Sequence, residues 1–302
     1  MTAAMRKILL VLVLAAVPPA ASGADTSALP FLRLPAGARS VAMGEAFTAA
    51  ADDATALYWN PALLSAAPGN SAALMHASYL EGTSYDFAAA SVKSGPNAFA
   101  LGIQRFSSGD MTEFDDTGAD IGSFSQVDTA FVLAYGRALG EGYSLGGAAK
   151  YIHSRIMASA DAYAFDFGLA TPYYLDKVRF AVTAANIGAR IQYERDNEDL
   201  PFLVRGGAAA RLTPEFLLTA EAGLPKAGNK YLAAGVEYAA RMDSLSIAGR
   251  LGYNSRTASD VPGLSGLSAG CGFGIASLTL DYALTFFGDL GKAHRFSLLY
   301  KF

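Results

Sequence analysis

Hydrophobic and polar residues alternate along most of this chain, in segments of about ten residues. In one clear case Tyr163, Phe165 and Phe167 fall on one face of a strand, while small or polar residues fall on the other. From residue 71 onward we count about fourteen such segments. Their spans are 71–80, 83–93, 97–107, 125–139, 142–156, 161–171, 177–188, 201–212, 215–224, 230–240, 244–254, 265–275, 277–287 and 293–302. The pattern predicts two-faced β-strands.

The last segment places aromatic residues on one face and Arg295, Ser297 and Lys301 on the other. Tyr300 and Phe302 end the apolar face. An edge strand of a soluble sandwich is one interpretation. The other is a membrane barrel whose apolar face meets lipid. This ending resembles the C-terminal signal read by the outer-membrane barrel assembly machinery, so we expect that machinery and outer-membrane lipid as partners.

The connections between segments favour the barrel. In an outer-membrane barrel both ends of the wall lie on the periplasmic side, so the odd-numbered connections face outward and tend to be long. Here the third, seventh and eleventh connections are the long ones: 108–124, 189–200 and 255–264. Even-numbered connections, such as Gly140-Glu141 and Thr213-Pro214, are tight. We therefore predict an all-β transmembrane antiparallel barrel of about fourteen strands.

Composition agrees with this prediction. Hydrophobic residues make up 52% of the chain and charged residues only 17%, below the level usual for soluble domains. Beyond the N-terminus no apolar run reaches the length of a membrane-spanning helix. Cys271 is the single cysteine and excludes an internal disulfide. The net charge of −4 gives no reason to expect nucleic acid as a partner.

The first residues indicate export. Arg6 and Lys7 precede the apolar run Ile8–Val17, and small residues follow up to Ala24. This order is typical of a cleaved signal peptide over residues 1–24, with an uncleaved anchor as the alternative. Export places the chain in the outer membrane of a Gram-negative-type bacterium.

Residues 25–70 are rich in alanine and punctuated by glycine. Gly37 and Gly44 permit tight turns, Asp52 or Asp53 can cap a short helix, and Asn60-Pro61 predicts its end. With a barrel behind it, this segment resembles the PorV/PorQ family, within the FadL-type group of outer-membrane transporters. The matching residues include Arg39, Gly44, Asp52, Asp53, Trp59, Asn60 and Pro61.

The resemblance implies that residues 25–70 fold as a hatch inside a barrel formed by residues 71–302. No cofactor and no metal are expected: the acidic loop 110–120 offers oxygens that could bind calcium, but their spacing matches no calcium-loop motif. For the paired Asp52-Asp53 and Asn60-Pro61, capping within the hatch is the preferred interpretation over ligand binding.

Charged residues on the small-residue faces are expected in the lumen, because ionisable groups facing lipid are costly. They are Asp128, Asp166, Arg205, Glu221, Glu237, Arg250, Asp281 and Arg295. Both signs occur, so these residues predict a network that holds the hatch; a selective pore is the alternative.

An enzyme is not expected. The sequence has no G-x-S-x-G elbow and no H-E-x-x-H motif, and His76, His153 and His294 lie far apart. The acidic loop 110–120 and the charged loop 193–199 read as solvent-exposed, the latter also as a docking surface for a partner.

Three functions remain. The resemblance to FadL-type proteins implies passage of a hydrophobic small molecule, such as a long-chain fatty acid, through a kink in the wall or a shift of the hatch. Aromatic and aliphatic residues could line its pocket or simply pack the hatch: Phe31, Leu32, Phe47, Leu57, Tyr58 and Trp59. The PorV branch implies an accessory role in type IX protein secretion, with a secreted cargo protein as partner. The third is a structural barrel. We favour hydrophobic transport.

Overall fold

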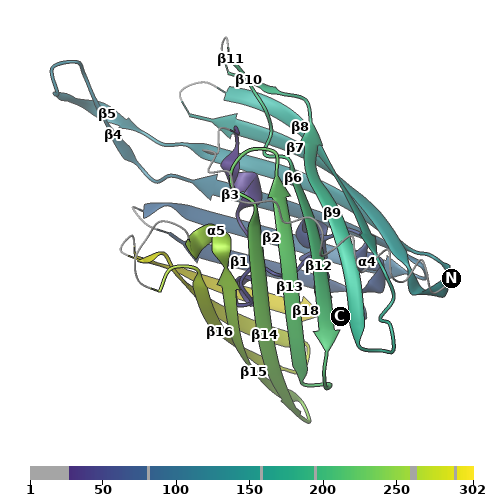
Figure 1. The fold of residues 1–302 in the computed structure, drawn as a ribbon. Helices are drawn as coiled ribbons and strands as arrows, with labels where there is room; N and C mark the ends of the chain where they lie inside the picture. The colour runs from purple at the N-terminus through teal and green to yellow at the C-terminus, as the bar shows by residue number, and fades with distance from the viewer. Residues whose placement is uncertain (1–26, 80–81, 157–158, 194–195, 259–263, 289–290) are drawn as a thin grey trace.

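The computed structural model describes residues 27–79, 82–156, 159–193, 196–258, 264–288 and 291–302, and the expected signal peptide lies outside them. The chain folds as a closed antiparallel barrel (Figure 1). The wall strands are β1 (Ser71–Ser78), β2 (Ser84–Ser94), β3 (Asn97–Ser107), β6 (Val127–Ala138), β7 (Ser144–Arg155), β8 (Ser159–Ala170), β9 (Val178–Gly188), β12 (Leu203–Arg211), β13 (Phe216–Pro225), β14 (Tyr231–Met242), β15 (Leu245–Asn254), β16 (Leu267–Ile275), β17 (Leu278–Phe286) and β18 (Lys292–Lys301). The predicted fourteen-stranded barrel is confirmed.

Each wall strand pairs with its neighbours along the chain, and β1 pairs with β18 to close the sheet. The closing register joins Ser71 to Lys301 and Ser78 to His294. Closure leaves no wall strand with an unpaired edge, which a barrel in a water-free environment requires. Every predicted segment corresponds to one wall strand, with small differences at the ends.

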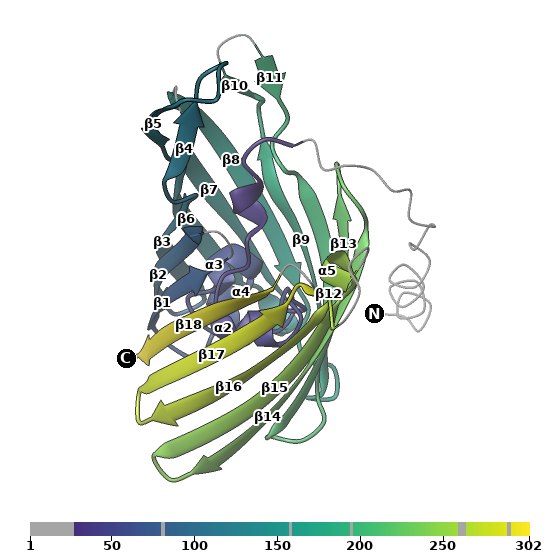
Figure 2. The ribbon, with the colours of Figure 1, turned by 90° about the vertical axis from the view of Figure 1, so that its left-hand side faces the viewer.

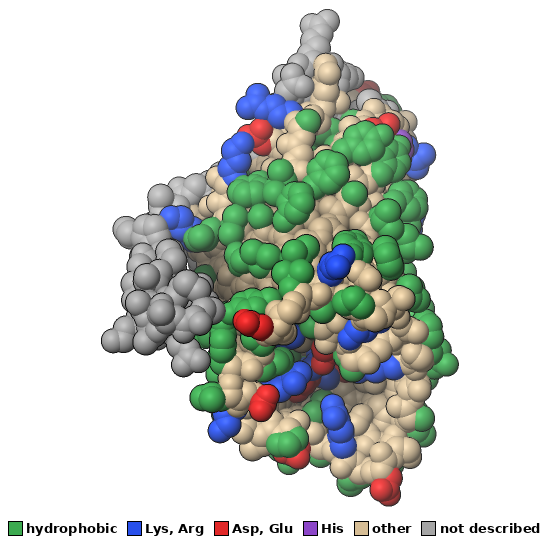
Figure 3. Space-filling model, turned by 90° about the vertical axis from the view of Figure 1, so that its right-hand side faces the viewer, with side chains coloured by type: hydrophobic (Ala, Val, Ile, Leu, Met, Phe, Trp, Pro, Cys, Tyr) green, Lys and Arg blue, Asp and Glu red, His purple; other side chains and the backbone are tan. Residues whose placement is uncertain are grey.

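The two faces of the wall differ as the alternation predicts. On β8, Tyr163 and Leu169 point outward and are 64% and 56% exposed, while Asp166 between them points inward and is fully buried. Figure 3 shows hydrophobic side chains over broad areas of one face of the molecule, with basic and acidic side chains gathered around a hollow. The outer surface is therefore apolar and the lumen is polar and small-residue-rich.

The long connections carry structure of their own. The third connection forms a hairpin of β4 (Met111–Phe114) and β5 (Asp120–Phe124), which projects far from the wall (Figure 1). The seventh forms a short hairpin of β10 (Ile191–Tyr193) and β11 (Asp196–Glu198), and the eleventh contains the helix α5 (Ser255–Ala258). The fourth, between β6 and β7, is the short turn η3 (Gly140–Gly142). The sequence analysis predicted the segments 110–120 and 193–199 as solvent-exposed loops, and in the structure each takes part in one of these hairpins.

The described part of the hatch, residues 27–70, lies inside the barrel (Figure 2). It contains η1 (Pro30–Arg33), α2 (Ala38–Ala42), α3 (Ala56–Trp59) and α4 (Leu63–Ala66), and none of these residues forms a strand. Helix α2 contacts β15 to β18 on one side of the lumen, and α4 contacts β2, β3, β6 and β7 on the other. Within the described residues, no helix is both long and apolar enough to cross a membrane.

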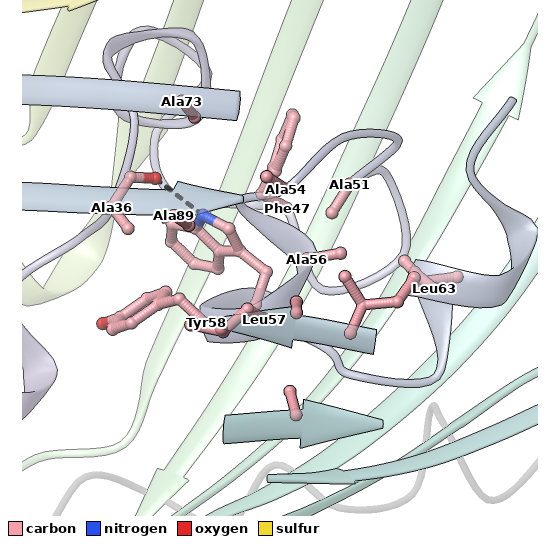
Figure 4. Close-up of a cluster of buried hydrophobic side chains, with 14 of the residues drawn as sticks. Ala36, Phe47, Ala51, Ala54, Ala56, Leu57, Tyr58, Leu63, Ala73 and Ala89 are labelled. Atoms are coloured by element: carbon pink, nitrogen blue, oxygen red, sulfur yellow. Dashed lines mark hydrogen bonds between the residues drawn. The ribbon is translucent and has the colours of Figure 1, made fainter. Parts of the chain in front are cut away.

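The hatch has an apolar core shared with the wall. Trp59 packs edge-on against Phe47 and Tyr58, with ring centroids 5.9 and 5.0 Å away. Its indole N–H donates to the carbonyl of Ala36 at 2.8 Å, the dashed line in Figure 4. Wall alanines such as Ala73 and Ala89 complete the cluster. Burial of large aromatic rings among small wall residues supplies the hydrophobic stabilisation that holds the hatch in place.

Glycines in the wall let the backbone of the hatch come close. A Cβ atom on Gly252 would lie 1.9 Å from the amide nitrogen of Gly44, and one on Gly146 would lie 2.4 Å from the carbonyl carbon of Pro61. Gly44 itself has φ of 66°, which favours glycine. Wall glycines on different strands, among them Gly252 in β15 and Gly146 in β7, therefore make room for the hatch.

We expect Gly252→Ala to loosen the hatch, because the added methyl group overlaps the Gly44 backbone and overpacking costs about 1–3 kcal/mol. Limited proteolysis of the hatch and unfolding in urea should both show the loss. Gly249→Ala is the matched control, since Gly249 lies on the same strand with open space beside it. Equal protease resistance in the two variants would contradict the close packing.

Candidate functional site

A chain of ion pairs, partly buried at Arg39 and Asp52 and buried at the other members, joins helix α2 to the wall. It is here called the latch: Arg39, Asp52, Glu237, Arg250 and Asp281. The Arg39 guanidinium donates to both carboxylate oxygens of Glu237 at 2.8 Å and to Asp52 at 2.6 Å. Arg250 donates to Glu237 and to Asp281, each at 2.6 Å. Because each charge has a partner of opposite sign, the latch offsets part of the cost of burying these groups.

The two adjacent aspartates of the hatch have different environments. Burial by itself raises the pKa of the Asp52 carboxyl, but Arg39 and Lys301 outweigh burial and hold the pKa below its ordinary value. Burial and the neighbouring Asp52 raise the pKa of Asp53. Asp53 accepts hydrogen bonds from the amide and hydroxyl of Thr55, in the turn before α3. Asp52 therefore forms an ion pair of the latch. Asp53 stabilises the turn before α3, and neither aspartate caps that helix, whose N-cap has no side-chain hydrogen bond.

Wall side chains also bind the backbone of the hatch. Glu221 accepts hydrogen bonds from the amides of Phe47 and Thr48, at 3.1 and 2.9 Å. Arg205 donates to the carbonyls of Tyr58 and Trp59 at 3.0 and 3.1 Å, and its guanidinium lies 4.9 Å from the centre of the Trp59 ring. The Phe47 amide also bonds the Glu45 carbonyl, whereas the Thr48 amide and the carbonyls of Tyr58 and Trp59 find their partners in the wall.

Asn60 and Pro61 end α3 and meet the wall. The Asn60 amide donates to the carbonyl of Leu169 at 3.2 Å and its oxygen accepts from the amide of Ala62. A Cβ on Gly168 would lie 2.0 Å from that oxygen, so this contact also needs a glycine in the wall. Asn60-Pro61 thus forms a structural stop, in agreement with the preferred interpretation.

A second polar cluster lies in the wall itself. Lys150 lies 2.7 Å from Asp166 and donates to the side-chain oxygen of Asn186 at 2.7 Å. The backbone N–H of Asn186 donates to the Asp166 carboxylate at 2.8 Å. The pairing of β8 with β9 shifts register between Phe165 and Phe167, so the wall is irregular at this cluster.

The remaining predicted lumen residues lie nearer the long loops. Asp128 accepts from the hydroxyl of Ser154 at 2.6 Å and from the side chain of Gln126 at 2.7 Å. Arg295 donates to the hydroxyls of Thr285 and Tyr79. All eight predicted lumen residues are thus buried inside the barrel, but the structure brings only Glu237, Arg250 and Asp281 together in the latch.

Several polar residues that contact the hatch or the bulge did not stand out in the sequence. Lys150 lies on the same face as Ile152, so its alternation with Tyr151 was an available signal. Asn186 lies inward only because of the register shift, which no pattern indicated. Arg256 on α5 pairs with Glu45 and ties the eleventh connection to the hatch. Phe31, Leu32, Phe47, Leu57, Tyr58 and Trp59 are buried in the apolar clusters of the hatch and wall.

Neither a protein-family model nor a curated protein sequence matches this chain. Solved structures do match its fold. The monoaromatic hydrocarbon channel CymD has a TM-score of 0.61 at 10% identity, over 88% of this chain and 97% of that chain. A Pseudomonas aeruginosa FadL homologue has a TM-score of 0.59 at 13% identity, over 93% and 100%. The Pseudomonas putida toluene transporter TodX has a TM-score of 0.55 at 12% identity, over 92% and 98%.

At these identities the likeness shows a shared fold. The expectation of a FadL-type barrel with an N-terminal segment is confirmed at the level of fold. The finer resemblance of residues 31–64 to the PorV/PorQ family stays a prediction.

We expect Arg250→Glu to raise ion conductance in planar bilayers. The variant places a third acid beside Glu237 and Asp281, and breaking a buried ion pair costs about 3–5 kcal/mol. The latch, which connects the hatch to the wall through Glu237, is thereby weakened. Glu221→Lys should act similarly by removing the acceptor for the Phe47 and Thr48 amides.

The matched control is Arg241→Glu, the same charge change on an exposed residue of β14. Conductance of Arg250→Glu equal to that of this control would show that the latch does not hold the hatch.

Proposed function

We propose that this chain is an outer-membrane barrel that binds small hydrophobic molecules and passes them across the outer membrane. The observation that carries the proposal is a closed barrel with an apolar outer surface whose lumen is filled by the hatch. Water-filled pores keep a polar open lumen, whereas here aromatic and aliphatic side chains occupy it. Solved proteins with the same fold include channels named for monoaromatic hydrocarbons and for toluene.

Passage of a molecule requires a change in this structure. Either the hatch shifts, which breaks the latch, or the wall opens where its hydrogen-bond ladder is irregular. The register shift between β8 and β9 is such a place, and Lys150, Asp166 and Asn186 hold it closed from the inside. Apolar cargo leaving through the wall would enter the hydrocarbon of the membrane directly.

The location follows from the same surface. Outward residues such as Leu101, Leu251 and Phe167 are 65%, 60% and 58% exposed, which suits hydrocarbon better than water. Export by a cleaved signal peptide over residues 1–24 and folding by the barrel assembly machinery complete the proposal. Tyr300 and Phe302 lie exposed on the outer face, with rings stacked at 5.6 Å, where such machinery could bind them.

A second candidate function is the accessory role in protein secretion. The projecting β4–β5 hairpin favours it, because Phe114 and Ile121 are 62% and 56% exposed on a hairpin rich in acidic residues. A barrel with a purely structural role would have no use for such a projecting hairpin. A secreted protein with a basic and apolar surface segment would complement it.

We expect gentle purification from the native outer membrane to retain a stoichiometric apolar small molecule without a protein partner. Mass spectrometry of bound lipids and co-purifying proteins reads both classes at once. A co-purifying secreted protein with no retained small molecule would move the assignment to protein secretion.

The route can be tested with a cross-link between hatch and wall. The Ala38 amide donates to the Ser297 hydroxyl at 2.7 Å, so hatch and wall touch here. The pair Ala38→Cys and Ser297→Cys, made together with Cys271→Ala, is the cross-link to make, and loss of free thiols on oxidation shows that it has formed. We expect oxidation to stop uptake of toluene or oleate by cells if the hatch must move, and reduction to restore it. Unchanged uptake with the thiols fully oxidised would assign passage to the wall.

A further inference from the structure

The outer wall carries a groove across β17, β18, β1, β2 and β3, with a cavity volume of about 450 Å³. This volume is within the range of ligand pockets. Its outward-facing floor and sides are apolar: Leu74, Ala88, Ile103, Leu280, Phe296 and Leu298. Ala88 lies between Leu74 and Ile103 in the register of the sheet. The groove exists because a methyl group stands here between two large side chains.

One end of the groove is charged. His76, Asp86 and Arg105 are neighbours in the sheet register, two residues closer to the long loops than Leu74, Ala88 and Ile103 on the same strands. The His76 ring nitrogen Nδ1 lies 2.7 Å from the Asp86 carboxylate. The exposed Arg105 guanidinium has no hydrogen-bond or ion-pair partner among the described residues. The Asp86 carboxylate and the unpaired Arg105 guanidinium therefore lie next to each other at one end of the apolar groove.

The row of polar residues continues in register over further strands. The row continues through Thr129, His153 and Asp161, which follow Arg105 in register. His153 Nδ1 lies 2.8 Å from Asp161, and the Tyr151 hydroxyl donates to the same carboxylate at 2.9 Å. A polar row above tyrosines is typical of the interface between hydrocarbon and headgroups. His76, Asp86 and Arg105 each lie two residues from the end of their strand, on β1, β2 and β3. The charged end of the groove is therefore near the rim of the wall, where lipid headgroups lie.

We propose that this groove binds one phospholipid with a phosphoethanolamine headgroup. An acyl chain fills the apolar groove, the phosphate accepts hydrogen bonds from the Arg105 guanidinium, and the ammonium group meets the Asp86 carboxylate. The proposal rests on the membrane location proposed above. An anionic headgroup without an ammonium group could still bind Arg105 through its phosphate, but it would bring no cation to the Asp86 carboxylate.

A second groove on the same wall provides an internal comparison. It crosses β12 to β16, has a cavity volume of about 580 Å³ and is also floored by small residues, among them Ala208, Ala220 and Ala234. None of its lining residues is an aspartate, glutamate, lysine, arginine or histidine. It can hold hydrocarbon but offers no charged pair to a headgroup, so it should not select among lipids.

The test is native mass spectrometry of the full-length protein in detergent, titrated with dioleoyl phosphatidylethanolamine or dioleoyl phosphatidylglycerol. We expect one tightly held lipid and a preference of about tenfold for phosphatidylethanolamine, the size of one charge-assisted hydrogen bond. Asp86→Asn should remove the preference, and Arg105→Gln should weaken binding of both lipids.

Ala88→Phe fills the groove and should abolish the tight site, while Ala220→Phe makes the same change in the second groove and should leave it intact. Heat-dependent mobility on a gel checks that each variant is folded. Equal binding of the two lipids by the unaltered protein, or tight binding retained by Ala88→Phe, would overturn the proposal. This readout involves no transport, so the lipid site and hydrophobic passage can fail independently.

Discussion

Closure of the sheet between β1 and β18 is the constraint on which the rest of this structure depends. A wall that faces hydrocarbon cannot leave backbone groups unpaired, so every strand needs two neighbours. Fourteen strands satisfy this requirement but enclose a lumen wider than inward side chains can fill. The small inward residues of the wall, chiefly alanine and glycine, widen it further. The hatch fills that space.

Filling the lumen with chain creates a second problem, because the hatch brings its own polar backbone into a buried place. Its helices are only four or five residues long and satisfy few of its amides and carbonyls. The wall supplies the missing partners through Glu221, Arg205 and Asn254, among others. Arg205, Glu221 and Glu237 are thus explained by the hatch that they contact, whereas Asp128, Asp166 and Arg295 bond to residues outside the hatch.

The inner and outer surfaces of the wall each carry one of the two proposals, transport and lipid binding. Inside, ion pairs hold the hatch, and the proposed movement of the hatch would have to break them. On the outer surface, small side chains between larger ones leave grooves. The groove with a charged end is the one proposed to bind a lipid headgroup. Transport and lipid recognition would then use opposite faces of the same strands.

The alternation of side chains determined the barrel, its strand number and the direction in which each charged residue points, since these depend only on a period of two and on the solvent on either side. The sequence could not show which charges meet. Glu237 and Arg250 face each other in the register of neighbouring strands, but Arg39 reaches them across about two hundred residues of chain. Nor could it show the bulge that turns Asn186 inward, or the groove at Ala88, because both depend on the shape of adjacent strands. Local periodicity sets the faces of a strand; only the closed sheet decides which residues become neighbours.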